Sequence, residues 1–207
     1  MQKIALSIQK GDVADFTLPD NGFIKGEKPE EYVNKALDNR PLEKLKIPFL
    51  AIATDIQSGQ EIAFSRGNGG TAVRSSCSIP GVFRPVQVAG HTYVDGGVVS
   101  PVAVDAARRQ GADVVIAVDI SSDMGAEQPR STIETILQAI SIMYAKIATA
   151  QLVRADVVIR PKVGYIGAAD FEKRHEAIME GEKAAMAAMP QIRAVLERLR
   201  LEGRLAS

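Results

Sequence analysis

The strongest hydrophobic pattern in the chain is a set of apolar runs of strand length. Residues 47–56 and 113–120 are apolar at nearly consecutive positions, which is typical of strands buried on both faces of a mostly parallel sheet. Residues 156–161 predict a last strand of the same kind, with residues 157–159 as its core. Such strands need helices above and below them, so the runs predict a central sheet that is covered on both faces.

Turn signals between runs of strand length predict two β-hairpins. A short glycine-containing turn separates residues 47–56 from a more alternating run at 61–65. A second turn joins residues 84–89 to residues 92–94. This second hairpin leads directly into Asp95, which the pattern places at the end of a strand. In α/β folds, ligands collect beyond the carboxyl ends of the strands, so this position is a candidate for function.

Helical periodicity and turn signals predict the helices that connect these strands. The predicted helices cover residues 29–37, 71–78, 101–111, 130–154 and the region from Ala169 onward, with a break or bend near Pro190. The apolar stripe of helix 130–154 is expected to face the protein core rather than lipid. The step from helix 101–111 to the run 113–120 predicts a parallel crossover. The alternation of strands and helices predicts an α/β fold, a three-layer α/β/α domain with a mostly parallel central sheet.

Length and the first residues bound the domain organisation. A chain of 207 residues is long enough for one domain with a real core and short for two, so we expect a single domain over residues 1–207. Ile4, Leu6 and Ile8 alternate with smaller or polar residues and predict a short strand. No cap or turn introduces that strand, so the chain opens without the usual signals of a domain start.

Composition argues against several classes of partner. Lys plus Arg equals Asp plus Glu at 25 each, and no basic cluster with interleaved aromatic residues occurs, so nucleic acid is not expected as a partner. The sequence has no secretory signal pattern and nothing close to the roughly 20 apolar residues of a membrane span, which predicts a soluble chain without a transmembrane segment. The single Cys77 excludes an internal disulfide and fits a reducing compartment, so we expect a cytoplasmic location.

Candidate ligands for a metal or cofactor are few. Cys77 is expected to be a buried small apolar residue, and the two histidines, His91 and His175, lack metal-ligand spacing. His175 lies among charges and is expected at the surface. The glycine-rich turn 67–70 precedes helix 71–78, whose start could receive an anion, but no Walker lysine or GxGxxG spacing accompanies it. We therefore expect no metal and no cofactor, and nucleotide binding is the weakest alternative function.

The stretch 91–101 contains an Asp-Gly-Gly turn. A β-rich run ends at Val94, Asp95 follows at once, and Gly96 and Gly97 let the backbone turn without Cβ clashes. Taken alone, this motif is compatible with a tight turn of no functional meaning. A catalytic interpretation therefore needs support from the rest of the sequence.

That support comes from separated stretches that agree with one family in the same order. The stretches are residues 47–56 followed by Ser58-Gly59, residues 72–81, the motif at 94–97, and residues 111–119, 155–161 and 180–185. In this ordered set the sequence resembles the patatin-like phospholipases, over nearly the whole chain from about Gly22 onward. The resemblance implies a patatin-like α/β domain that acts on a lipid or acyl-ester substrate.

The resemblance also implies which residues carry the chemistry. In that family an aspartate is hydrogen-bonded directly to the serine that attacks the ester carbonyl, a Ser-Asp dyad without histidine. The resemblance assigns this aspartate to Asp95 as general base, with Gly96 and Gly97 as the motif turn. An exposed aspartate with a pKa of about 3.9 is a weak base at neutral pH, so we expect Asp95 to be partly desolvated.

The sequence departs from the family in the other half of the site. It contains neither a GxSxG elbow for the nucleophile nor the glycine-rich oxyanion loop. Ser58 has Gly59 directly after it, and Ser76 and Ser78 lie in the predicted helix 71–78. Without a nucleophile no acyl-enzyme forms, so we expect the chain by itself to be inactive.

The absent motifs lead to expectations about the chain as a whole. We expect a domain truncated at its N-terminal βα units, whether the chain is a fragment, the product of a late start codon or a paralogue that abandoned catalysis. The alternative function, from a different class, is a non-catalytic lipid-binding or scaffold protein. A bared sheet edge predicts self-association, and a lipid substrate leaves peripheral membrane contact open.

Overall fold

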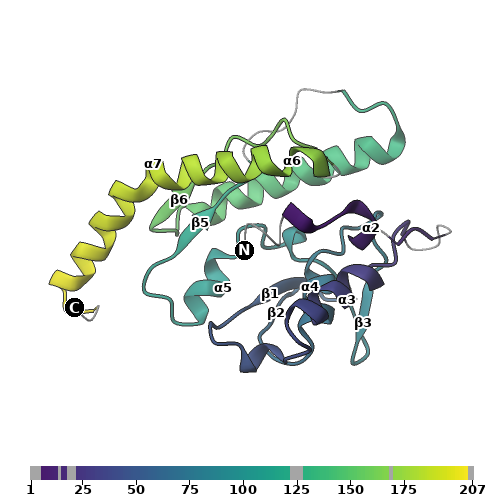
Figure 1. Ribbon diagram of the computed structural model, residues 1–207, viewed down its shortest axis with the longest axis horizontal. Coiled ribbons are helices and arrows are strands. Elements are labelled where there is room, and N and C mark those ends of the chain that lie inside the picture. The colour runs from purple at the N-terminus through teal and green to yellow at the C-terminus, as the bar shows by residue number, and fades with distance from the viewer. Residues whose placement is uncertain (1–5, 14, 18–21, 122–127, 168–169, 205–207) are drawn as a thin grey trace. The chain divides into compact units, whose positions relative to one another are not determined.

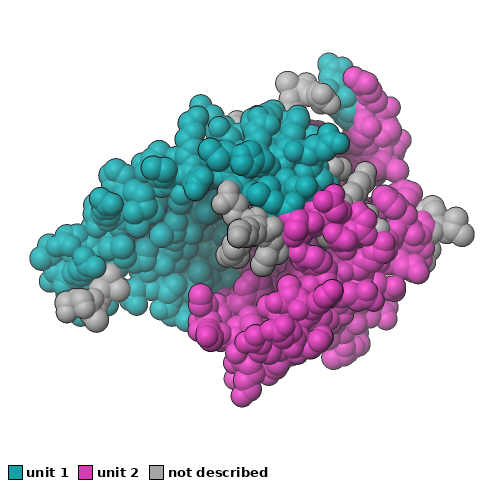
Figure 2. Space-filling model, in the orientation of Figure 1, with its two compact units in different colours: residues 1–6, 102–129, 145–207 teal, residues 7–101, 130–144 magenta. Residues whose placement is uncertain are grey.

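The computed structural model describes residues 6–13, 15–17, 22–121, 128–167 and 170–204 (Figure 1). The chain divides into two compact units, which Figure 2 colours separately. Unit 1 consists of residues 1–6, 102–129 and 145–207, and unit 2 consists of residues 7–101 and 130–144. The single domain over residues 1–207 stays a prediction, and each unit is described by itself below.

Unit 2 contains a four-stranded sheet in which every pairing is antiparallel. Its strands are β1 (Ala51–Asp55), β2 (Glu61–Phe64), β3 (Val86–Val88) and β4 (His91–Asp95), in the order β2-β1-β4-β3. The mixed α/β class is confirmed, but the mostly parallel central sheet is wrong. Burial of all five residues of β1 reflects its central place in an antiparallel sheet, because an apolar run records burial and not the direction of the neighbouring strand.

Both predicted hairpins of unit 2 are confirmed. β2 folds back on β1 with Ala53 opposite Ile62, and β3 folds back on β4 with Gln87 opposite Thr92. The turn between β3 and β4 is Ala89-Gly90, with φ of 51° and 84°, a left-handed pair that suits a two-residue hairpin loop.

The helices of unit 2 are α2 (Lys10–Val13), α3 (Glu27–Ala36), the short 3-10 helices η1 (Leu42–Lys44) and η2 (Gly96–Val98), and α4 (Gly69–Ser76). Among them, α4 and the 3-10 helix η2 pack against this sheet. The α4 helix packs against β1 and against α3, where Arg74 Nη1 and Glu30 Oε2 form an ion pair of 2.9 Å. Leu42, Ala51 and Ala72 form the buried cluster of this unit.

The predicted strand at the chain start is wrong where the structure describes it. Leu6 is helical, and Ile4 lies outside the described residues. Alternation over three apolar positions is too short to distinguish a strand from one turn of helix, which explains the error.

Unit 1 contains a parallel pair of strands and the helices around it. Its elements are α5 (Val104–Arg109), β5 (Ile116–Val118), β6 (Val157–Ile159), the 3-10 helix η3 (Phe171–Lys173) and α7 (Arg174–Leu201). The long helix α6 (Thr132–Leu152) belongs to unit 2 as far as Tyr144 and to unit 1 from Ala145 onward. Ala117 of β5 pairs with Val158 of β6, so the parallel crossover runs from β5 through α6 to β6. The sequence predicts a parallel crossover at the step from helix 101–111 into β5, and the parallel partner that the structure gives β5 is β6, which follows it in the chain.

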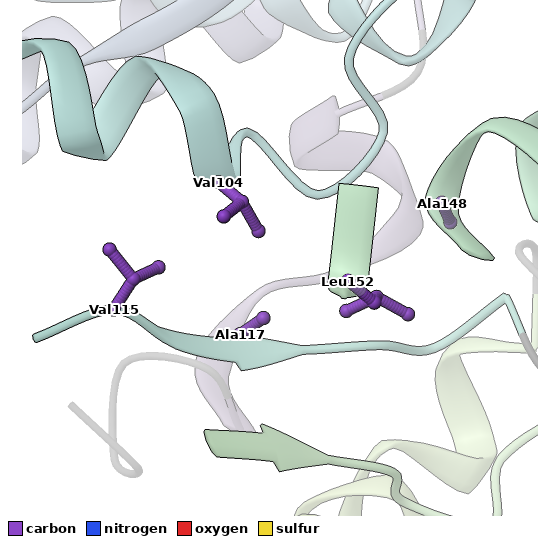
Figure 3. Close-up of a cluster of buried hydrophobic side chains, with 5 residues drawn as sticks. All are labelled: Val104, Val115, Ala117, Ala148 and Leu152. Atoms are coloured by element: carbon purple, nitrogen blue, oxygen red, sulfur yellow. The ribbon is translucent and has the colours of Figure 1, made fainter. Parts of the chain in front are cut away.

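A cluster of small and branched side chains forms the core of unit 1. Figure 3 shows Val104 of α5, Val115 and Ala117 around β5, and Ala148 and Leu152 of α6 gathered together. The two neighbours of Ala117 in β5 point to the opposite side of the strand and are exposed, Ile116 by 43% and Val118 by 55%. Burial of this strand on both faces is therefore a wrong prediction.

Two predicted helices of unit 1 differ from the structure. The α5 helix begins at Val104 and not at Pro101, because Ala103 has a left-handed backbone with φ of 48° and so cannot continue a helix. The α7 helix is continuous through Pro190, so the predicted break is wrong, whereas a bend is the other expectation and Figure 1 shows the α7 ribbon curving along its length.

The predicted burial of the apolar stripe of α6 is wrong for several of its residues. Ile133, Ile136 and Met143 are exposed by 48%, 52% and 54%, whereas the prediction placed them in the core. Helical spacing defines an apolar face but does not say which element covers it. The buried residues of this helix are Ala148, Gln151 and Leu152, near its end.

Candidate functional site

Asp95 is the last residue of β4, and the backbone on both sides of it is fixed within unit 2. Its N–H donates to the Ser78 carbonyl at 2.9 Å, and its own carbonyl accepts the Thr54 hydroxyl at 3.0 Å. Across the sheet it stands opposite Ala53 of β1. The side chain therefore leaves the sheet from a defined position at the strand end, as the hairpin pattern predicted.

The carboxylate of Asp95 caps the turn that follows it. Its Oδ1 accepts the Gly97 N–H at 2.6 Å, which makes Asp95 the N-cap of η2. Oδ2 has no hydrogen bond to any residue that the structure describes. One carboxylate oxygen is thus held by the turn, and the other is free to accept a proton or a ligand group.

Gly96 brings the turn against the backbone of β1. A Cβ at this position would lie 2.6 Å from the Ile52 carbonyl carbon and still closer to its oxygen. Because backbone atoms of a central strand cannot move aside, only glycine fits here.

Gly97 brings the turn against an aromatic ring. A Cβ at this position would lie 2.5 Å from Tyr144 Cε2 and 2.9 Å from Asp95 Oδ1. Tyr144 belongs to the part of α6 that lies in unit 2. The glycine pair therefore serves two close approaches, one to a strand backbone and one to a tyrosine.

The electrostatic surroundings of Asp95 are unusual for a carboxylate. Burial raises the pKa of Asp95, and the Gly97 N–H offsets that rise only in part. Burial together with the Asp95 charge raises the pKa of the Tyr144 hydroxyl, and the same two causes raise the pKa of the Cys77 thiol. A carboxylate with a raised pKa is a stronger base than a solvated one.

Cys77 does not match its predicted place in the core. It is the C-cap residue of α4 and is exposed as a residue, although the protein atoms around its thiol desolvate that group enough to raise its pKa. Its N–H donates to the Val73 carbonyl at 3.0 Å, so the chain end of the helix fixes its position. The surface position predicted for His175 is confirmed, because this residue is exposed.

The structure does not bring a serine hydroxyl onto Asp95. Ser75 and Ser78 are buried near the site, but their hydroxyls donate to carbonyls of α4, those of Thr71 at 2.8 Å and Arg74 at 2.7 Å. The Ser58 hydroxyl accepts a 3.3 Å hydrogen bond from its own turn. Among the described residues, no serine hydroxyl hydrogen-bonds to the Asp95 carboxylate.

Two features near the site escaped the sequence reasoning. Tyr144 lies in the predicted helix 130–154, whose apolar stripe the sequence places in the core, and no local signal connects it with a motif on another element. The second feature is a contact of 2.7 Å between His91 Nδ1 and Asp55 Oδ2. The backbone N–H groups of Ser58 and Gln57, together with His91, outweigh the effect of burial and lower the pKa of Asp55, so this carboxylate joins the end of β1 to the start of β4.

The glycine-rich turn before α4 is occupied by internal contacts. The Gly70 N–H donates to Asn34 Oδ1 at 2.9 Å, and the Thr71 N–H donates to Asn68 Oδ1 at 2.8 Å. In the part of the chain that the structure describes, no three His, Cys, Asp or Glu side chains gather closely enough to hold a metal ion.

No helix within the described ranges combines the length and the apolar character needed to cross a bilayer. Peripheral membrane contact, self-association and a cytoplasmic location stay predictions.

The fold and this turn define the class of the protein: a mixed α/β chain whose candidate site is a strand-end aspartate with two glycines after it. Residues 6–108 match the family model of the patatin-like phospholipases, a span that contains Asp95, Gly96 and Gly97. The chain therefore belongs to the patatin-like phospholipase family, a family of lipid hydrolases, through these residues. The resemblance seen in the sequence is confirmed.

Individual relatives extend this similarity along the chain. An uncharacterized NTE family protein of Mycobacterium tuberculosis is 35% identical over 48% of this chain and 28% of its own length. A second such protein of the same organism is 27% identical over 86% of this chain and 35% of its own length. Patatin-like phospholipase domain-containing protein 7 of Mus musculus is 32% identical over 53% of this chain and 8% of its own length. The matched region thus spans about a third or less of these relatives.

Proposed function

We propose that this chain carries the base half of a serine acyl hydrolase site, in which Asp95 is the general base for hydrolysis of a lipid ester. The observation that carries the proposal is the Asp95 carboxylate itself. One oxygen is anchored by the Gly97 N–H at 2.6 Å, and burial raises the pKa of the group. Gly96 and Gly97 keep side chains away from the place where a nucleophile has to approach.

The reaction follows from a directly paired serine and aspartate. The serine oxygen forms a bond to the ester carbonyl carbon while its proton passes to the carboxylate. The tetrahedral intermediate then expels the alcohol, which takes that proton, and leaves an acyl-serine. Water then attacks the acyl carbon while Asp95 accepts its proton; the bond to the serine oxygen breaks, the proton returns to that oxygen, and the carboxylic acid is released. Oδ2 of Asp95, which has no hydrogen bond to the described residues, is the oxygen that we assign to these transfers.

The chain by itself should not complete this reaction. Its sequence has no GxSxG elbow, and the buried hydroxyls of Ser75 and Ser78 are engaged by helix carbonyls. We therefore expect the 207 residues alone to leave 4-nitrophenyl butyrate at its spontaneous rate of hydrolysis. Turnover that disappears in Asp95→Asn would show that another serine acts as nucleophile.

Supplying the other half of the site tests the proposal directly. A patatin-like segment with a GxSxG elbow and a glycine-rich loop is fused to the chain or co-expressed with it, and ester hydrolysis is measured. We expect turnover that requires both the supplied serine and Asp95, since Asp95→Asn keeps the Gly97 hydrogen bond but removes the base. The matched control is Asp113→Asn, which changes an exposed aspartate paired with Arg204 and should retain activity. A folded, inactive assembly would make Asp95 a turn residue and favour the non-catalytic lipid-binding alternative.

A further inference from the structure

The hydroxyl of Tyr144 is an exception to a strong rule of protein structure. The oxygen is buried and has no hydrogen-bond partner among the described residues. More than about nine in ten buried polar groups have such a partner, because an unpaired buried hydroxyl destabilises the folded state. An unpaired donor in this position therefore calls for a binding partner that is not part of the described chain.

The orphan hydroxyl lies next to the candidate site. The Gly97 Cβ position lies 2.5 Å from Cε2 of the Tyr144 ring, 3.0 Å from Cδ2, and 2.9 Å from Asp95 Oδ1. Cε2 is bonded to the carbon that carries the hydroxyl, so the hydroxyl end of the ring is the end nearer to this glycine. Tyr144 and Asp95 are thus neighbours across Gly97, with no side chain between them, and all three belong to unit 2.

The two groups also have complementary roles. The Asp95 carboxylate offers an acceptor oxygen, Oδ2, without a partner among the described residues. Burial and the Asp95 charge raise the pKa of Tyr144, so its hydroxyl keeps its proton and acts as a donor throughout the physiological range. A ligand group placed beside Gly97 therefore meets one fixed acceptor and one fixed donor.

We infer that Tyr144 is a ligand-binding residue of the Asp95 site, whose hydroxyl donates a hydrogen bond to an ester oxygen of the bound acyl ligand. The inference rests on the proposed function for the chemical class of the ligand. It assigns Gly97 a second purpose, since a larger residue there would push the ring away from the carboxylate.

The variant Tyr144→Phe isolates the hydroxyl, because it keeps the ring that packs on Gly97. If the hydroxyl serves a ligand, its removal should change two quantities in opposite senses: the stability of the ligand-free chain should rise and the affinity for the ligand should fall. The ligand-free chain should become more stable, with a Tm higher by roughly 2–4 °C, because an unpaired buried polar group is lost. Ligand affinity should fall by roughly three- to tenfold, the range of one neutral hydrogen bond.

The experiment uses the full chain and hexanophenone, a ketone that keeps the acyl carbonyl and has no bond to hydrolyse. Binding is followed by NMR at the Gly96 and Gly97 amides, and Tm is measured without ligand. Tyr165→Phe is the control, because the Tyr165 hydroxyl is on an exposed residue and donates to Glu176 at 2.8 Å. We expect the control to bind normally and to show no rise in Tm.

The outcomes separate this inference from the proposed function. A lower Tm in Tyr144→Phe would show that the hydroxyl has a structural partner, and unchanged affinity would show that the ligand does not use it. Either result overturns the inference while Asp95-dependent hydrolysis in the fused protein still supports the proposed function. If hexanophenone does not perturb the Gly96 and Gly97 amides in the unaltered chain, both the ligand class and the role of Tyr144 are wrong.

Discussion

Asp95 in unit 2 and Asp156 in unit 1 are both partly buried aspartates at strand ends, but their surroundings give them opposite properties. Asp95 ends β4, and among the described residues its carboxylate has one N–H partner and no cation, so burial raises its pKa. Asp156 precedes β6 and accepts the Val115 N–H at 2.8 Å and the guanidinium of Arg108. Burial alone would raise the pKa of Asp156, but these two donors outweigh it and hold the pKa below its ordinary value.

The comparison separates a structural carboxylate from one suited to chemistry. Asp156 joins the start of β5 to Arg108 of α5 through its Oδ2, and the guanidinium of Arg108 compensates its charge within the fold. The Asp95 carboxylate has no such cation beside it among the described residues and remains at an energetic disadvantage when ionised. A residue that costs stability and has unused bonding capacity is a candidate for function.

The largest expected effect tests the geometry that positions Asp95. Gly96→Ala should lower the free energy of unfolding by about 3 kcal/mol or more, because the new Cβ would collide with the Ile52 carbonyl of β1. Urea denaturation measures this loss. Gly181→Ala in α7 is the matched control, since no atom lies within 4 Å of its Cβ position. That control should be neutral or gain roughly 0.5–1 kcal/mol, and an equally stable Gly96→Ala would show that the close approach is not rigid.

The next effect tests the structural carboxylate. Asp156→Asn should lower the free energy of unfolding at pH 7 by about 1–2 kcal/mol, because two hydrogen bonds lose the help of a charge. The folded pKa of Asp156 is lowered, so its stabilising contribution is present above the unfolded pKa of about 3.9 and is lost as the pH falls through the folded value. Urea titrations from pH 7 to pH 3 should therefore show the variant and the parent chain converging in acid.

The smallest effect has the opposite sign. Asp95→Asn should raise the Tm at pH 7 by a few degrees, because an amide keeps the Gly97 hydrogen bond without burying a charge. The folded pKa of Asp95 is raised, so the parent chain loses stability as the pH rises through that value and the advantage of the variant disappears below the unfolded pKa. Thermal melts across the same pH range measure it. A variant that is less stable than the parent at pH 7 would contradict the comparison with Asp156.

Local patterns in the sequence predicted the elements around Asp95 well. Both hairpins, the strand-end position of Asp95 and the helix now seen as α6 follow from periodicity and turn residues. The role of Gly96 and Gly97 also follows from the sequence, because a sharp turn directly after the strand-end Asp95 favours residues without a Cβ atom. These features depend on residues that are neighbours in the sequence, so local sequence patterns are sufficient to predict them.

Other features depend on which segments meet in space. The antiparallel pairing of β1 with β4, the exposure of Ile136 on α6 and the contact of Tyr144 with Gly97 join positions that are distant in sequence. An apolar residue has the same local signature whether a strand, a helix or a ligand covers it, and a tyrosine carries no mark of the group that its hydroxyl faces. The sequence by itself determined the strands around Asp95, the turn and the family. The tertiary structure decided the direction of the strands in the sheet and placed Tyr144 beside Asp95. The burial and the pKa of Asp95 also depend on the tertiary structure, because contacts between distant segments set them.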